Sequence, residues 1–273
     1  MNLHEADTRA NLINKQLSQA GWNVGQRLVI TEARLTGQSH IAEIPEVYQA
    51  GDEYIDYLLL DREGNPIAIV EAKRTSRDPL EGQRQAADYA DRLKANSGIE
   101  PFIFLTNGHE IWFWDRSLYP PRPVSGYLTL ADLETRAFQR RYRETLRLLA
   151  PNRGIINRHY QLEAVRRVTE AVEESRRHFL LVMATGTGKT RTVIALIDLL
   201  FRAKWINRVL FLADRRELVR QALADFKTYM PHESRARLEG GLIENDARIH
   251  VTTYPSMIQI YNQLSVGYYS TFA

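Results

Sequence analysis

The segment MATGTGKT, residues 183–190, constrains the fold of this chain more than any other stretch. It follows the apolar run HFLLV and opens the amphipathic run TRTVIALIDLLF. Glycines at this spacing let successive backbone N–H groups turn toward a phosphate, and a helix start adds the positive end of its dipole. The order of strand, glycine loop and helix therefore predicts a phosphate-binding loop in a parallel α/β sheet.

Within this loop, Lys189 is expected to reach the β- and γ-phosphates of ATP, and the Thr190 hydroxyl to ligate the accompanying Mg²⁺. Met183 departs from the general pattern because it occupies the first glycine position. A glycine-rich turn with a capping threonine is the weaker alternative, given the elements on either side. The predicted nucleotide-binding residues of the loop are Thr185, Gly186, Thr187, Gly188, Lys189 and Thr190.

Strands and helices are predicted to alternate around this loop, which favours a parallel sheet with helices on both sides. ATP hydrolysis would also need an Asp-Glu pair beyond the loop to hold Mg²⁺ and position water. The stretch LIENDARIH offers Glu244 and Asp246 but reads as a loop, so we expect at most weak nucleotide binding and no ATPase activity from this chain alone. The predicted elements are helix 158–175, strand 178–183, helix 189–203, strand 207–213, helix 215–229 and strand 248–253.

A second candidate site lies in EYIDYLLLDREGNPIAIVEAK, residues 53–73, which reads as a β-hairpin around the turn DREGN. Asp56 is on its first strand, whereas Glu71 and Lys73 end the second strand on one face. A solvated strand end would explain these charges without any function. In the alternative, the two carboxylates bind a Mg²⁺ that activates water against a phosphodiester, and Lys73 stabilises the developing negative charge. The hairpin residues alone leave both interpretations open.

The helix predicted after this hairpin has Asp78 as its N-cap and Glu81 completing a capping box. It places Gln85 and Tyr89 four residues apart on one face. Glu5, near the amino terminus, is more simply a solvated acid in the first turn of a helix.

Charge and composition differ between the N-terminal and C-terminal parts of the chain. Acidic side chains outnumber basic ones in residues 1–118, whereas residues 119–273 are strongly basic and begin with the proline-rich stretch LYPPRPVSG. We therefore predict a domain at 1–118, a linker and basic helical connector at 119–157, and a second domain at 158–273. Cysteine is absent, which excludes disulfides and Cys-based zinc sites. No apolar run approaches the ~20 residues of a membrane span and no signal peptide is visible, so a cytoplasmic protein is expected.

Several motifs of the chain resemble those of known protein families. HYQLEAV contains Gln161, which alone would read as an exposed helix residue. In its place before MATGTGKT, HYQLEAV resembles the Q motif of superfamily 2 helicases, whose glutamine reads adenine. VLFLADRRELVRQAL resembles their motif Ia, and IHVTTYPSM resembles the next strand and turn, which touches a nucleic acid strand. Asp56 with Glu71-x-Lys73 resembles the PD-(D/E)xK nuclease core. Gln85 with Tyr89 resembles its QxxxY motif, which implies that they support the placement of DNA.

Nuclease and motor motifs in this order resemble the R (restriction and motor) subunit of type I restriction–modification enzymes. The resemblance implies an α/β chain: a restriction-endonuclease-like α/β/α domain followed by a RecA-like P-loop domain, incomplete before its Asp-Glu motif. It implies Mg²⁺-dependent cleavage of double-stranded DNA, coupled in the complete protein to ATP-driven translocation. Methyltransferase and specificity subunits would be the partners. The alternatives are a nuclease–helicase of DNA repair and a non-catalytic module that binds DNA or a partner.

Overall fold

The structure is a computed structural model and describes residues 9–35, 41–42, 54–238 and 247–263. These residues form two compact units, unit 1 up to Ala137 and unit 2 from Phe138. Each unit has its own apolar core.

Unit 1 is built on a seven-stranded sheet of order β2-β1-β3-β4-β5-β6-β7. Neighbouring strands run antiparallel except β4 and β5, which are parallel and are joined through helix α3 (Gln83–Ser97). A parallel pair needs such a crossover because its strands start at the same edge of the sheet. The strands are β1 (Val29–Leu35), β2 (Ile41–Ala42), β3 (Tyr54–Leu60), β4 (Pro66–Ala72), β5 (Phe102–Thr106), β6 (Ile111–Trp114) and β7 (Arg122–Val124).

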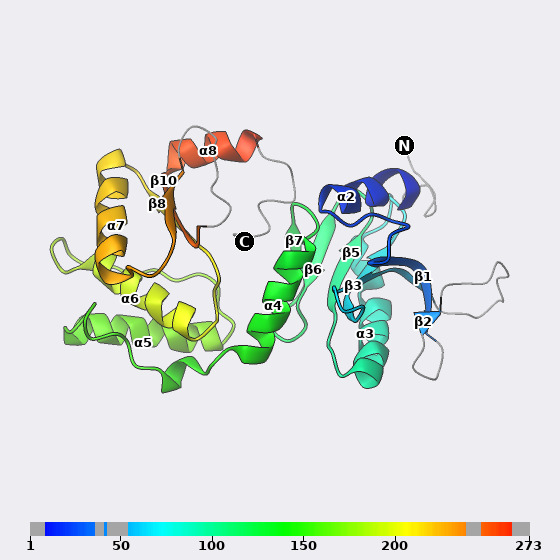
Figure 1. Ribbon diagram of the computed structural model, residues 1–273, viewed down its shortest axis with the longest axis horizontal. Coiled ribbons are helices and arrows are strands. Elements are labelled where there is room, and N and C mark those ends of the chain that lie inside the picture. The colour runs from blue at the N-terminus through cyan, green and yellow to red at the C-terminus, as the bar shows by residue number, and fades with distance from the viewer. Residues whose placement is uncertain (1–8, 36–40, 43–53, 239–246, 264–273) are drawn as a thin grey trace. The chain divides into compact units, whose positions relative to one another are not determined.

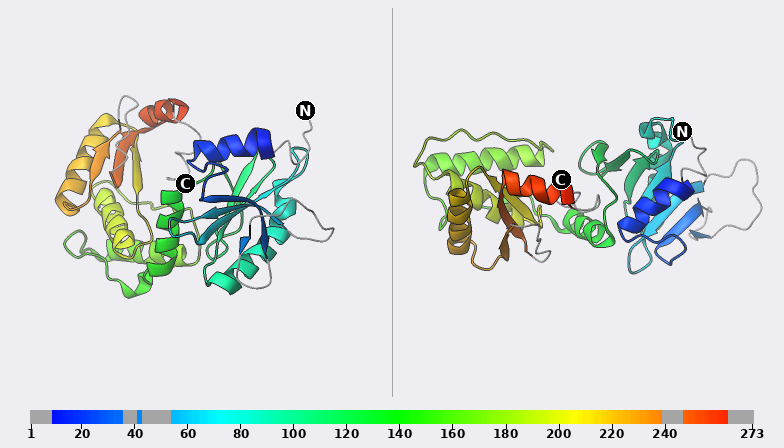
Figure 2. Two further views of the ribbon diagram at one scale, coloured as in Figure 1. Left: turned by 45° about the vertical axis from the view of Figure 1, so that its right-hand side comes forward. Right: turned by 90° about the horizontal axis from the view of Figure 1, so that it is seen from above.

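Helices cover both faces of this sheet. The π-helical turn Arg9–Ile13 and α2 (Asn14–Gln19) pack Ile13 and Leu17 into one core cluster, whereas α3 packs Tyr89 and Leu93 into another. From Tyr57 to Leu60 of β3, successive side chains enter the two clusters in turn, as the period of two predicts. Figures 1 and 2 show α2 and α3 on opposite sides of the strands. The predicted α/β/α arrangement is confirmed.

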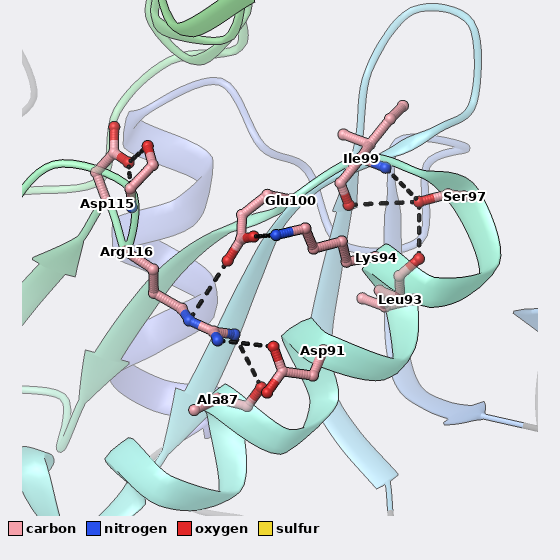
Figure 3. A network of polar contacts seen from close by, with 10 residues as sticks. Ala87, Asp91, Leu93, Lys94, Ser97, Ile99, Glu100, Asp115 and Arg116 are labelled. Atoms are coloured by element: carbon pink, nitrogen blue, oxygen red, sulfur yellow. Dashed lines mark hydrogen bonds and ion pairs between the residues drawn. The ribbon is translucent and has the colours of Figure 1, made fainter.

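Polar contacts of Arg116, just after β6, fasten α3 over the sheet (Figure 3). Its guanidinium donates to the Ala87 carbonyl at 3.0 Å and to Asp91 at 2.7 Å. It also pairs with Glu100 at 3.4 Å, and Glu100 in turn pairs with Lys94 of α3 at 2.6 Å. One side chain thus joins the helix to the segment that leads into β5.

Replacing Arg116 by methionine should therefore destabilise unit 1. Methionine keeps much of the apolar stem but loses the bonds to α3, which together contribute about 1 kcal/mol. We expect the melting temperature to fall by about 2–4 °C, measured by near-UV circular dichroism. Arg84→Met removes an exposed arginine from the same helix and should change little. An equal fall in both variants would show that the Arg116 contacts are not the cause.

The proline-rich stretch is more than the linker that the sequence suggests. Within it, β7 pairs antiparallel with β6, and Tyr127, Leu128 and Leu133 are buried in the core of unit 1. The Trp22 indole N–H also donates to the Leu128 carbonyl at 2.8 Å. Pro123 is tolerated in β7 because an edge strand has one side without a ladder partner. Helix α4 (Leu130–Tyr142) follows and contains the boundary between the units.

Unit 2 contains a parallel three-stranded sheet of order β8-β10-β9. This confirms the predicted parallel α/β class. Its strands are β8 (Val209–Ala213), β9 (Arg235–Arg237) and β10 (Ile249–Thr253). Its helices are the 3-10 turn Leu146–Leu148, α5 (His159–Glu173), α6 (Lys189–Arg202), α7 (Arg216–Tyr229) and α8 (Tyr254–Gln263).

The strand predicted at 178–183 is wrong. Residues 176–184 have no regular secondary structure, and the side chains of Leu180 and Val182 are each 87% exposed. A strand needs a neighbour for its backbone hydrogen bonds, and in the described ranges no strand of the β8-β10-β9 sheet pairs with this run. Apolar composition alone could not supply that partner. Among the helices that the structure describes, none has the length and apolar character to span a membrane.

Candidate functional site

The two carboxylates predicted for the nuclease site lie on neighbouring strands. Tyr57 of β3 faces Val70 of β4 in this antiparallel pair, and Asp56 and Glu71 are the residues next to Tyr57 and Val70 on their strands. The Asp56 carboxylate also accepts a hydrogen bond from the Ala72 N–H at 2.7 Å. This bond ties Asp56 to the end of β4, the strand that also carries Glu71.

Glu71 and Lys73 form an ion pair in which the carboxylate is buried and the lysine is partly exposed. The Lys73 ammonium lies 2.6 Å from the Glu71 carboxylate, and Glu71 is only 2% exposed. Removing a carboxylate from water to this extent costs several kcal/mol unless a cation accompanies it. The solvated strand end that the sequence left open therefore does not describe Glu71.

Helix α3 extends this ion pair into a chain of hydrogen bonds. Lys73 donates to the Gln85 side-chain oxygen at 3.1 Å, and the Gln85 amide donates to the Tyr89 hydroxyl at 2.9 Å. The ring of Tyr89 is buried in the core beneath the helix. The structure thus brings Glu71, Lys73, Gln85 and Tyr89 together, and it ties Asp56 to the same strand end.

The turn before α3 differs from the predicted capping box. Asp78 does cap the turn, accepting from the Leu80 N–H at 2.8 Å, but Pro79–Gly82 is a 3-10 helix that precedes α3. Glu81 pairs instead with Arg77, at 2.8 Å. The turn is therefore tighter than an α-helical start, and this brings its last residue close to the strand end.

Gly82 is a residue of this site that sequence reasoning missed. A Cβ atom at this position would lie 2.7 Å from the Glu71 Cγ and 3.2 Å from the Lys73 Cε. The backbone of the turn therefore covers the apolar stems of both charged side chains. No local signal marks such a glycine, because the contact joins residues that are distant along the chain.

The ligand chemistry of the two acids fits Mg²⁺ better than a metal held by protein ligands alone. Among the described residues there is no cluster of three His, Cys, Asp or Glu side chains that could hold a metal ion. Mg²⁺ is commonly bound through one or two carboxylates, with water and substrate phosphate oxygens completing its shell. Asp56 and Glu71 provide hard oxygen ligands of this kind.

The phosphate loop of unit 2 has the predicted glycine turn and helix start, without the predicted strand before them. Gly186 and Gly188 adopt φ values of 77° and 85°, which a residue with a Cβ rarely takes, and α6 begins at Lys189. Thr190 lies in the first turn of α6, while Thr185 is exposed in the loop. The Lys189 ammonium donates to the carbonyls of Met183 at 3.3 Å and Ala184 at 3.2 Å. The lysine therefore contacts carbonyls of its own loop.

Gln161 contacts this loop directly. It is only 4% exposed, and its amide donates to the Thr187 carbonyl at 3.1 Å. The hydroxyl of its neighbour Tyr160 donates to the same carbonyl, also at 3.1 Å. The structure therefore brings Gln161 to the predicted nucleotide site, and the exposed helix residue that a lone glutamine suggests is not observed.

Arginines of the predicted basic connector are partly engaged in packing. The Arg136 guanidinium lies over the Phe113 ring at 5.6 Å within unit 1. Within unit 2, Arg143 lies over Trp205 at 4.8 Å, and Arg147 pairs with Glu173 at 2.8 Å. These contacts fasten the connector to each unit, so its positive charge is not simply a solvated surface.

Two family models match this chain. Residues 42–122 match the N terminus of the type I restriction enzyme R protein. Residues 155–270 match the res subunit of type III restriction enzymes. The first match contains the Asp56 and Glu71 hairpin, and the second contains Gln161 and the phosphate loop.

Curated relatives align along nearly the whole chain. The EcoAI endonuclease subunit of Escherichia coli is 29% identical over 274 residues, covering 94% of this chain and 32% of the relative. The EcoKI endonuclease subunit of Escherichia coli K12 is 28% identical over 327 residues, covering 95% and 27%. The chain thus spans 27–32% of their length.

Among solved structures, a fragment assigned to the HsdR subunit of a type I restriction enzyme from Vibrio vulnificus is 27% identical. It aligns with 97% of this chain and 49% of its own, at a TM-score of 0.42. The R-protein and restriction-subunit models match in succession and both curated relatives are endonuclease subunits of type I restriction enzymes, so the chain is similar to these subunits along nearly its whole length.

Proposed function

We propose that unit 1 is the endonuclease of a type I restriction enzyme and cleaves double-stranded DNA with Mg²⁺. The observation that carries the proposal is the ion pair of the buried Glu71 with Lys73 beside Asp56. Two acids and a lysine at the end of a β-hairpin are the groups that a metal-assisted phosphodiester hydrolysis requires. Asp56 adds a second carboxylate at the same strand end, where it accepts a hydrogen bond from the Ala72 N–H.

Each side chain has a distinct task in this proposal. Asp56 and Glu71 would hold Mg²⁺, which would polarise the phosphodiester and lower the pKa of a bound water. Lys73, held between Glu71 and Gln85, would stabilise the negative charge that develops on the phosphate oxygens. Gln85 and Tyr89 would keep the lysine in place against α3.

We further propose that unit 2 binds ATP with its own Mg²⁺ through Gln161 and residues 185–190. Lys189 would exchange the Met183 and Ala184 carbonyls for phosphate oxygens, and Thr190 would contact the metal. In the complete protein, hydrolysis would drive DNA translocation, with methyltransferase and specificity subunits as partners. Both matched family models describe restriction enzymes, which favours this function over a repair nuclease–helicase or a non-catalytic module.

A calorimetric Mn²⁺ titration of the chain tests the nuclease site. Mn²⁺ accepts the same oxygen ligands as Mg²⁺. Wild type should show saturable binding that Asp56→Asn loses, because the amide removes the charge but keeps an oxygen for the Ala72 N–H. Asp88→Ala deletes an exposed acid of α3 and should bind like wild type. Binding that survives in Asp56→Asn, or is absent from folded wild type, would contradict the proposed site.

A further inference from the structure

We infer that Gly82 is a positioning residue of the nuclease site, required because its bare backbone leaves the space that the Glu71 and Lys73 side chains occupy. The inference rests on the proposed nuclease function and extends it to a residue outside the Asp56, Glu71 and Lys73 set. Its origin is the close approach of the 3-10 turn Pro79–Gly82 to the end of β4.

The backbone conformation of Gly82 does not itself call for glycine. Its φ of −79° and ψ of −5° lie in the right-handed helical region, which every L-residue adopts. Gly98 and Gly108 differ, with φ values of 72° and 86° that favour glycine. At Gly82 the requirement is therefore one of space and not of dihedral angle.

A Cβ atom added at Gly82 would come too close to the side chains of the two site residues. The nearest atom to an added Cβ would be the Glu71 Cγ at 2.7 Å, followed by the Lys73 Cε at 3.2 Å. Non-bonded carbon atoms pack at about 3.5–4.0 Å. An alanine at this position would thus push against both members of the ion pair.

The turn itself is poorly able to yield. The Asn107 side-chain amide donates to the Arg77 carbonyl at 2.9 Å, which fastens the start of the turn to the end of β5. Asp78 caps the turn, and both Pro79 and Gly82 are buried. Because the turn is fixed at its start and covered at its end, an added Cβ at Gly82 would displace the side chains of Glu71 and Lys73.

Such a displacement acts on the metal site through Glu71. Metal ligands must be held within about 0.5 Å of their working positions, and changes in the residues that support them typically cost 10- to 100-fold in metal affinity. Glu71 would move relative to Asp56, which is tied separately to the Ala72 N–H. Lys73 would also lose its alignment with Gln85.

The test is a Mn²⁺ titration of the whole chain by calorimetry. We expect Gly82→Ala to raise the dissociation constant for Mn²⁺ about tenfold or more without altering the fold. Gly154→Ala, in unit 2, makes the same chemical change where an added Cβ would meet only the Asn152 side chain. It should bind Mn²⁺ like wild type.

The outcomes separate the two proposals. If wild type and Gly82→Ala bind Mn²⁺ equally, the inference is overturned while the nuclease site stands. If folded wild type does not bind, the metal site fails and the inference with it.

Should Gly82→Ala not fold, the same substitution in a Glu71→Ala background decides the question, because that background removes the Cγ that the added Cβ would strike. Recovery of a cooperative melting transition in the double variant would support the inference. Continued failure to fold would overturn it.

Discussion

Replacing Lys73 by methionine should reduce DNA cleavage by about 10²- to 10³-fold, the usual cost of removing one group that stabilises transition-state charge. Methionine keeps a long apolar side chain beneath the Gly82 turn, so the packing of the site is largely preserved. The charge on the phosphate oxygens would then lack its cation. Cleavage is measured as the conversion of supercoiled plasmid DNA to nicked and linear forms in the presence of Mg²⁺.

The Lys73→Met substitution should also lower the free energy of unfolding. Without Lys73, the carboxylate of Glu71 is buried without its ion-pair partner, which typically costs about 3–5 kcal/mol. A bound divalent cation can replace the lost positive charge. Added Mn²⁺ should therefore raise the melting temperature of Lys73→Met more than that of wild type.

Lys94→Met is the matched control, because Lys94 of α3 forms an ion pair with Glu100 and its side chain is 55% exposed. It should cleave DNA like wild type. If Lys73→Met cuts DNA at the wild-type rate while remaining folded, Lys73 serves the structure and not the chemistry.

Replacing Lys189 by alanine should weaken ATP binding by about 10- to 100-fold, which corresponds to losing charge-assisted hydrogen bonds of about 1.5–3 kcal/mol. The Lys189 ammonium contacts carbonyls of its own loop, those of Met183 and Ala184, so the fold should tolerate the change. The measurement is a titration of the chain with a fluorescent ATP analogue in the presence of Mg²⁺.

Lys227→Ala, which removes an exposed lysine of α7, provides the control for a general loss of positive charge. A similar loss of affinity in both variants would indicate non-specific attraction of the nucleotide. An unchanged affinity in Lys189→Ala would rule out the loop as the phosphate site.

Local patterns in the sequence were sufficient to identify most of the elements around the two sites. The alternation of side chains along a strand put Glu71 and Lys73 on one face, and a spacing of four residues put Gln85 and Tyr89 on one side of a helix. The glycines of the phosphate loop predicted a turn before a helix. These inferences succeed because each depends on the conformation of a few consecutive residues.

Those local patterns could not predict which distant segments of the chain pair with each other. The apolar run 178–183 has the composition of a strand, yet a strand exists only where another strand completes its hydrogen bonds. The proline-rich stretch reads as a linker, yet part of it pairs with β6 as an edge strand. In both cases the deciding contact involves residues outside the local segment.

The amino-acid sequence by itself determined which residue types are available for chemistry and the local geometry that presents them. Tertiary structure alone decided that Glu71 is buried, that Lys73 reaches Gln85 and that Gln161 touches the phosphate loop. It also decided that Gly82 must remain without a side chain. Burial and close packing depend on every segment that shares the same space, whereas periodicity depends only on the backbone of one segment.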